Sequence, residues 1–131
     1  MNTGKNIRSL LLALMVSAAT MGAAHAQAVS YKDTPLMVVR FNQERVYYQQ
    51  QLYNAVSRAL EAKPDVQFSI ISLVPETQDR SYNRRMQDEA RHNTGLFVAN
   101  MVKMGFPKNR IRIAYQIGPS IESNEVHMFV E

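Results

Sequence analysis

The stretch RSYNRRMQDEARHNTGLFVANMVKMGFPKNRI, residues 80–111, decides the fold. Its apolar positions recur three and four residues apart, which is the spacing of one face of an α-helix. Gly105 stands where a left-handed cap ends a helix, and Pro107 prevents a restart. The stretch therefore predicts a long helix, a tight stop and entry into a strand. The side chains predicted to face inward are Met86, Ala90, Thr94, Phe97, Met101 and Met104, with the methionines filling core gaps.

Upstream of this helix, two apolar runs flank a second helical pattern. Residues 36–41, LMVVRF, predict a short strand covered on both faces. Residues 66–74, VQFSIISLV, predict a central strand that Pro75 ends. Between them a helix is predicted to stop before Pro64, because its apolar residues have helical spacing. These residues are Leu52, Ala55, Val56, Ala59 and Leu60.

Downstream, two further strands complete the pattern. In residues 110–117 strict alternation separates an apolar face from a face that carries Arg110, Arg112 and Gln116. The apolar face is Ile111, Ile113, Tyr115 and Ile117. Residues 125–130 form the closing strand, with Val126, Met128 and Val130 inward. The order β-α-β-α-β-β predicts an α+β fold, a two-layer sandwich with two helices on one face of a mixed four-stranded sheet.

The N-terminus has the layout of a cleaved secretory signal peptide. Lys5 and Arg8 precede an apolar run, and Ala24-His25-Ala26 supplies small residues around a cleavage point. The run is too short and too diluted to cross a bilayer comfortably. We therefore expect residues 1–26 to be removed, 27–35 to form a loose lead-in, and 36–131 to form the single domain.

Composition narrows the class of protein further. Cleavage would leave 105 residues, enough for one small domain, and the chain has no cysteine for disulfides, thiol nucleophiles or thiolate metal sites. Removing Lys5 and Arg8 leaves 13 basic against 11 acidic residues. A nucleic-acid binder usually carries a larger positive excess interleaved with aromatics, so no nucleic-acid partner is expected.

Catalytic motifs are missing from the sequence. His92 and His127 show no carboxylate or second histidine at ligand spacing, and no nucleophile elbow, phosphate loop or dinucleotide turn occurs. Glu76 and Asp79 are neighbours in a loop with nothing to separate their pKa values into acid and base roles. We expect no enzyme, no catalytic residue, no metal and no cofactor, and we place a cell-wall hydrolase last among the alternatives.

One set of positions follows a recognisable order along the chain. These are Phe41, Leu52, Ala59, Leu60, Pro64, Tyr82, Asn83, Gly105, Phe106, Pro107 and Ile111, with Asn124 to Val130 as the closing strand. In these positions and in the order and spacing of its elements, the chain from Leu36 to Glu131 resembles the OmpA-like C-terminal domain family. That resemblance implies a βαβαββ fold and, for most members, non-covalent binding of peptidoglycan in the periplasm.

The resemblance also implies a ligand clasp, from which this sequence departs. The family uses an Asp in a Thr-Asp turn after the second strand and an Arg early in the second helix. Here no Thr-Asp follows that strand, and Asp79 is the one acidic candidate. The arginine position falls on Ala90 when counted from Tyr82-Asn83, with Arg91 one residue later, and on Asn93 when counted back from Gly105. The ligand-binding residues are accordingly expected to be Asp79, Asn83, Arg91 and Asn93.

The front of the long helix is basic, and two explanations remain open. Its arginines, Arg80, Arg84, Arg85 and Arg91, lie where the helix dipole disfavours cations, so they suit an anionic ligand. Alternatively, Arg84–Asp88, Arg85–Glu89 and Asp88–Arg91 form ion pairs along a solvated face.

Together these patterns predict a non-enzymatic, exported cell-envelope protein. We expect a periplasmic location, associated with the outer membrane or the cell wall, with no transmembrane span after cleavage. Its expected role is that of a binding or scaffold module for other envelope proteins, as an accessory of an envelope-spanning assembly. The alternative is peptidoglycan binding through a rebuilt Asp/Arg site.

Overall fold

The computed structural model describes residues 34–131; the predicted signal peptide and all but the last two residues of the predicted lead-in lie outside the described residues. The elements are β1 (Met37–Arg40), α2 (Gln49–Ala62), β2 (Phe68–Val74), α3 (Arg80–Lys103), the 3₁₀ turn η1 (Lys108–Arg110), β3 (Ile111–Ile117) and β4 (Glu125–Val130). Their order is the predicted one, and the α+β fold is confirmed.

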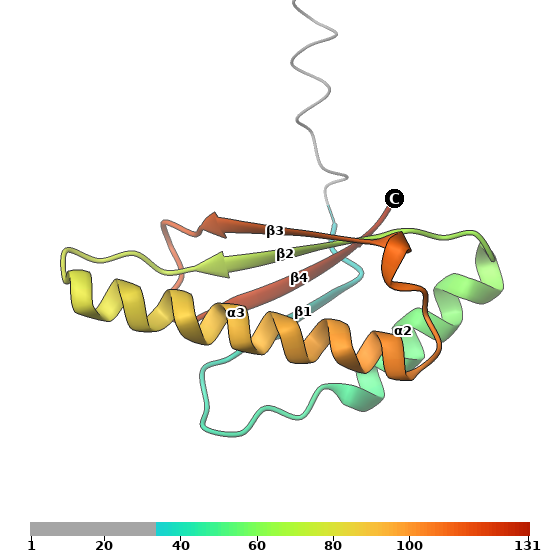
Figure 1. Ribbon diagram of the computed structural model, residues 1–131, viewed down its shortest axis with the longest axis horizontal. Helices are drawn as coiled ribbons and strands as arrows, with labels where there is room; N and C mark the ends of the chain where they lie inside the picture. Colours follow the sequence, from blue (N-terminus) through green and yellow to red (C-terminus); the bar gives the residue numbers. More distant parts are fainter. Residues whose placement is uncertain (1–33) are drawn as a thin grey trace, which may run out of the picture. The chain divides into compact units, whose positions relative to one another are not determined.

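The four strands form one mixed sheet in the order β1-β4-β2-β3. β4 is antiparallel to both β1 and β2, whereas β2 and β3 are parallel because α3 crosses over between them. Figure 1 shows α2 and α3 on the same side of this sheet, so within residues 34–131 no helix packs on its other face. We call that second side the open face.

The core lies between the helices and the sheet. Phe97 and Met101 of α3 and Leu52 of α2 are fully buried against Phe68 and Met128. Burial of each such side chain contributes about 1.5–3 kcal/mol, so this layer holds most of the fold's stability. The predicted inward stripe of α3 is largely confirmed, with Ala90, Thr94, Phe97 and Met101 buried and Met86 and Met104 at its partly buried margin.

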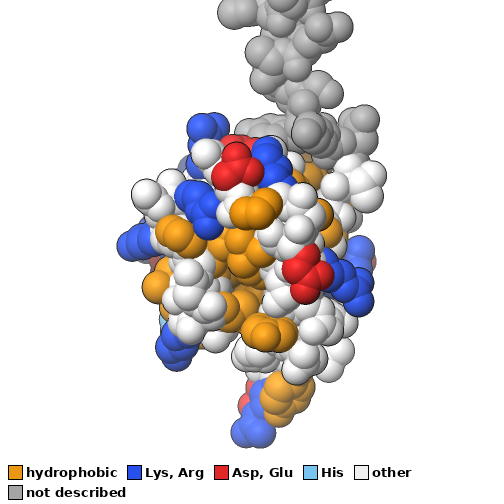
Figure 2. All heavy atoms as spheres, turned by 90° about the vertical axis from the view of Figure 1, so that its right-hand side faces the viewer, with side chains coloured by type: hydrophobic (Ala, Val, Ile, Leu, Met, Phe, Trp, Pro, Cys, Tyr) orange, Lys and Arg blue, Asp and Glu red, His pale blue; other side chains and the backbone are white. Residues whose placement is uncertain are grey.

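The C-terminal end of α3 is closed as predicted. Gly105 has φ +92°, and the N–H groups of Gly105 and Phe106 donate to the carbonyls of Val102 and Met101, which is the Schellman pattern. Phe106 is buried against Phe68, and the Arg110 guanidinium lies 4.9 Å from the centre of the Phe106 ring. Figure 2 looks onto the end that lies on the right of Figure 1, where apolar side chains gather at the centre with Lys and Arg around them.

One strand prediction is wrong in detail. Residues 36–41 were expected to be covered on both faces, but β1 is an edge strand in which only Met37 and Val39 are buried. Val38 lies half-buried on the open face and Arg40 is exposed there. β1 has four residues, MVVR, and only Arg40 is polar. So short a strand shows too few alternating positions for the sequence to reveal its exposed face.

Among residues 34–131, no helix combines the length and the apolar character that crossing a bilayer demands.

Candidate binding surface

Asp79, the acidic candidate, serves as the N-cap of α3. Its carboxylate accepts hydrogen bonds from the backbone N–H groups of Ser81 at 2.9 Å and Tyr82 at 3.2 Å. These donors have no partner inside the helix, so an aspartate at this position stabilises the helix start. The carboxylate therefore has a structural role in addition to any contact with a ligand.

Asn83 holds the loop that precedes α3. Its side-chain oxygen accepts from the backbone N–H of Thr77 at 2.8 Å, and its amide donates to the Thr77 carbonyl at 2.7 Å. Both ends of the side-chain amide are thus occupied by one loop residue. Asn83 fixes the loop between β2 and α3, and its polar groups are already satisfied without a ligand.

Arg91 and Asn93 lie on opposite flanks of α3. Two helical steps turn a side chain by about 200°, so residues two apart cannot line one cleft. Arg91 is exposed and lines a hollow of about 300 Å³ toward β3. Asn93 lines a different hollow, of about 550 Å³, between α3 and the loop that leads into α2.

The four predicted site residues are therefore not brought together. Asp79 and Arg91 are separated by twelve helical steps, or about 18 Å along the axis. Asp79 and Asn83 meet at the start of α3, where the Asn83 N–H donates to the Asp79 carbonyl at 3.0 Å and both residues bond to Thr77. Neither lines the hollow at Arg91 or the one at Asn93. No single cleft holds an acid and an arginine in the way the family resemblance implies.

The surface that sequence reasoning missed is a groove between α3 and β3. The helix-facing side of β3 carries the predicted apolar row, yet Ile113, Tyr115 and Ile117 are 44%, 50% and 55% exposed. α3 packs over β2 and leaves β3 uncovered, so this row faces solvent. We call the hollow part of this surface the β3 groove; its lining residues are Val74, Gln87, Arg91, Tyr115, Gln116 and Ile117.

The arginines at the front of α3, of which Arg91 lines the β3 groove, are not neutralised by ion pairs along the helix. In the described part of the chain none of the ion pairs involves α3, so the expected pairs of Arg84, Arg85 and Arg91 do not form. Arg85 instead lies 5.5 Å from the centre of the Tyr82 ring. Of the two alternatives for the basic helix front, the one with ion pairs along a solvated face is thus wrong, and the arginines remain exposed.

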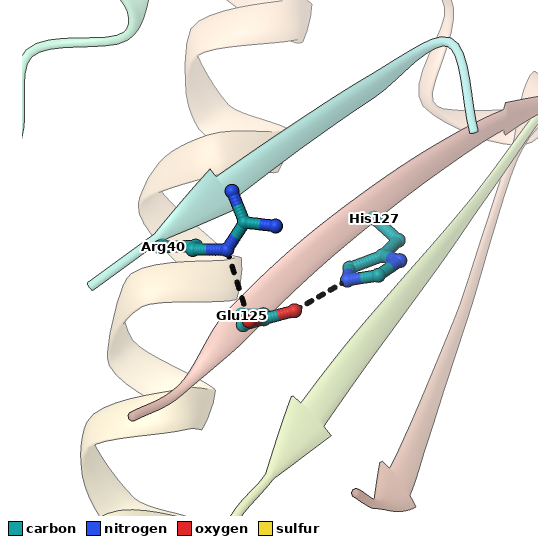
Figure 3. A network of polar contacts seen from close by, with 3 residues as sticks. All are labelled: Arg40, Glu125 and His127. Atoms are coloured by element: carbon teal, nitrogen blue, oxygen red, sulfur yellow. Dashed lines mark hydrogen bonds and ion pairs between the residues drawn. The ribbon is translucent and has the colours of Figure 1, made fainter. Parts of the chain in front are cut away.

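The open face carries a polar network that the sequence reading overlooked. Figure 3 shows Glu125 between Arg40 and His127, with 3.2 Å from Arg40 Nε to Glu125 Oε1 and 2.7 Å from His127 Nε2 to Glu125 Oε2. The sequence predicted no carboxylate at metal-ligand spacing from His127, yet Glu125 lies within hydrogen-bonding distance because residues two apart on a strand share a face. That spacing was the signal available in the sequence.

Few other reactive groups surround this network within residues 34–131. His127 lies between Val38 of β1 and Ile71 of β2, which are apolar cross-strand neighbours that supply no nucleophile. Within residues 34–131, no three His, Cys, Asp or Glu side chains gather in a way that could hold a metal ion. The network joins β1 to β4 on the open face.

Tyr48 is the one described residue whose pKa departs clearly from the ordinary value. Burial raises the pKa of its hydroxyl, and a hydrogen bond from the Asn100 side chain at 3.2 Å opposes that rise. Its ring stacks on Phe97 with 5.3 Å between ring centres. Tyr48 anchors the loop before α2, and its environment is that of a core residue.

No family model matches the chain, and no curated protein matches it either.

Proposed function

We propose that this chain is a non-enzymatic, exported cell-envelope protein that acts as a periplasmic binding or scaffold module within an envelope-spanning assembly. The proposal takes its location from the predicted signal peptide and its class from the resemblance to OmpA-like domains. The β3 groove is its partner surface in this proposal.

The single observation that carries the proposal is the exposure of Ile113, Tyr115 and Ile117 side by side on β3. Scattered apolar residues on a surface are ordinary, but a contiguous row flanked by polar and charged groups is typical of a protein interaction site. Tyr115 and Arg91 are also the residue types that dominate binding energy at interfaces. Both line the β3 groove.

The non-enzymatic part rests on how the polar groups are used. Asp79 caps a helix, Asn83 fixes a loop, and Glu125 holds Arg40 and His127. Each of these side chains has its hydrogen-bonding capacity directed at the fold, which fits a structural module better than a reaction centre.

Site-specific photo-crosslinking in the producing cell tests the proposal. A photoreactive residue at Ile113, Tyr115 or Ile117 is expected to give crosslinked adducts, because these side chains face the partner. Tyr47 and Tyr53, 80% and 54% exposed and placed before and within α2, are the matched controls and are expected to give none. Equal yields at both sets, or none at β3, would contradict a dedicated surface. N-terminal sequencing should find cleavage after Ala26.

Peptidoglycan binding is the second candidate, and one observation favours it. Arg91 is exposed in the β3 groove and forms none of the ion pairs in the described chain, so its guanidinium is available to a carboxylate. Retention on purified sacculi at high salt, lost in Arg91→Ala and kept in Arg84→Ala, would support this function. A wild-type chain that is not retained on purified sacculi would exclude peptidoglycan binding.

Asp79 needs a variant that separates its two roles. Asp79→Ala is expected to lower the free energy of unfolding by about 1 kcal/mol through loss of the cap, whereas Asp79→Asn keeps a good N-cap. Urea unfolding measures the first effect. If Asp79→Asn folds normally yet loses sacculus retention, the carboxylate contacts the ligand; if it keeps retention, Asp79 acts as a cap alone.

A further inference from the structure

Within residues 34–131, no strand pairs with the outer edge of β3. The Gly118 N–H donates to the Val74 carbonyl of β2 at 3.0 Å. Because backbone groups alternate along a strand, the even-numbered residues of β3 point their N–H and C=O groups toward β2. Ile113 and Tyr115 therefore point theirs away from the sheet, and no described residue pairs with them on that side.

This edge lacks the usual protection against pairing. Natural edge strands are blunted by proline, lysine, a bulge or very short length. β3 has seven residues, IRIAYQI, pairs with β2 in unbroken register from Ile111 to Ile117, and contains neither proline nor lysine. Arg112 is its one charged residue, and that side chain lies on the open face beside Glu131. The edge is therefore open to another strand.

The sequence of β3 is complementary to itself when read in the antiparallel direction. With Ala114 placed opposite its own copy, Ile113 meets Tyr115 and Ile111 meets Ile117. Pairs of aromatic and β-branched residues across strands are favourable. Arg112 meets Gln116, so the two arginines do not oppose each other. This register pairs every residue of the strand, and its hydrogen-bonded positions are those whose backbone groups point outward.

We propose that β3 pairs antiparallel with β3 of a second copy of this chain, about a two-fold axis at Ala114. The inference rests on the proposed function in taking the β3 groove as the partner surface, and it names the partner. Both apolar rows then lie on the helix-facing side of one continuous sheet. The exposed Ile113, Tyr115 and Ile117 of each copy cover those of the other, between the two α3 helices.

Self-pairing suits this edge better than a foreign strand does. An acidic strand from another protein would find only one cation on β3, Arg112. That arginine already lies 3.7 Å from Glu131, so it offers little additional attraction. A second copy instead supplies an apolar row of matching length and, opposite Arg112, the uncharged Gln116. Placing Arg112 opposite its own copy would set like charges against each other, which selects against that register.

A single cysteine tests the two-fold axis directly, because the chain has none of its own. Ala114 would lie in a non-hydrogen-bonded pair with its copy, about 4.5 Å between Cα atoms, within the range of a disulfide. The full sequence is expressed and purified as the cell processes it. Ala114→Cys is expected to give a disulfide-linked dimer on mild oxidation. Val38→Cys, half-buried on the open face of β1, is the matched control and is expected to form no disulfide-linked dimer.

The register has its own test. Arg112→Cys and Gln116→Cys are expected to crosslink when the two variants are mixed, because these residues oppose each other. Each variant alone should not crosslink, since Arg112 lies about 13 Å along the strand from its own copy. Crosslinking of either variant alone, or equal crosslinking of Val38→Cys, would overturn the proposed pairing.

Light scattering of the uncrosslinked chain completes the experiment. The wild type is expected to run at twice the mass of one chain, and Ile113→Lys with Tyr115→Lys at the mass of one, because lysines would face each other across the axis. Tyr53→Lys on α2 should remain dimeric, and circular dichroism should show that all variants are folded. A monomeric wild type whose Ala114→Cys variant does not crosslink overturns the inference. If the wild type is monomeric and β3 photo-crosslinks to a different protein, the proposed function stands and only the self-pairing of β3 is wrong.

Discussion

The two edge strands of the sheet, β1 and β3, both carry apolar residues on their helix-facing side, but only those of β1 are buried. At the β1 edge, Met37 and Val39 face the helices and are 8% and 4% exposed. At the β3 edge, Ile113 and Tyr115 face the same side and are 44% and 50% exposed. The difference comes from the helices, since α2 packs on β1 and α3 packs on β2, whereas neither packs as closely on β3. Apolar alternation specifies a face, and the helix above it decides whether that face is core or surface.

The largest contrast is expected from proline at neighbouring positions of β3. Ala114→Pro removes an N–H that points toward β2 and is expected to lower the free energy of unfolding by about 3 kcal/mol. Ile113→Pro removes an outward N–H and should cost about 1 kcal/mol or less. Urea unfolding at equal, low protein concentration measures both. Equal losses would show that the edge assignment of β3 is wrong.

The next contrast compares apolar side chains at the two edges. Met37→Ala on β1 is expected to cost about 2–3 kcal/mol, because it leaves a cavity in the core. Ile113→Ala on β3 should cost less than about 1 kcal/mol in the separated chain, because that side chain is half exposed. Thermal or urea unfolding of the two variants gives the comparison. A larger loss from Ile113→Ala would mean that the β3 row is already covered.

A buried tyrosine, Tyr48, and an exposed one, Tyr115, extend the contrast to pH. Burial raises the pKa of Tyr48 above its ordinary value of 10.0. Above pH 10 the unfolded chain releases this proton before the folded chain does. The stabilisation that is present below pH 10 is therefore lost as the pH rises through the pKa of the folded state. Tyr48→Phe is expected to remove this loss of stability at alkaline pH. Urea unfolding midpoints measured from neutral to alkaline pH test this expectation. Tyr115→Phe on β3 is the control and should retain it.

The smallest expected effects come from the ion pairs at the two edges. Arg40–Glu125 spans 3.2 Å with Glu125 12% exposed, whereas Arg112–Glu131 spans 3.7 Å with Glu131 31% exposed. Both arginines are largely solvated, so each substitution by Ala should cost no more than about 1 kcal/mol. Arg40→Ala is expected to be the costlier one, because Glu125 also binds His127. The reverse order in urea unfolding would contradict this ranking.

Element order, the Gly105 cap and the inward face of α3 could be predicted from the sequence because each depends on local spacing. Asp79 could be foreseen as a cap for the same reason. The exposure of Tyr115 could not, because it depends on which strand α3 packs over. The separation of Arg91 from Asn93 follows from helical geometry, but assigning them to different hollows required the loop before α2. The Glu125–His127 contact was within reach, since strand spacing alone places both on one face.

The position of β4 has a consequence for how the chain reaches its folded state. β4 follows every other described element in the chain, yet it lies in the middle of the sheet between β1 and β2. Until it arrives, β1 has no strand to pair with and the core lacks Val126 and Met128. We therefore expect folding during synthesis to wait until these residues have left the ribosome, and late folding would suit passage through a translocation channel in the proposed export.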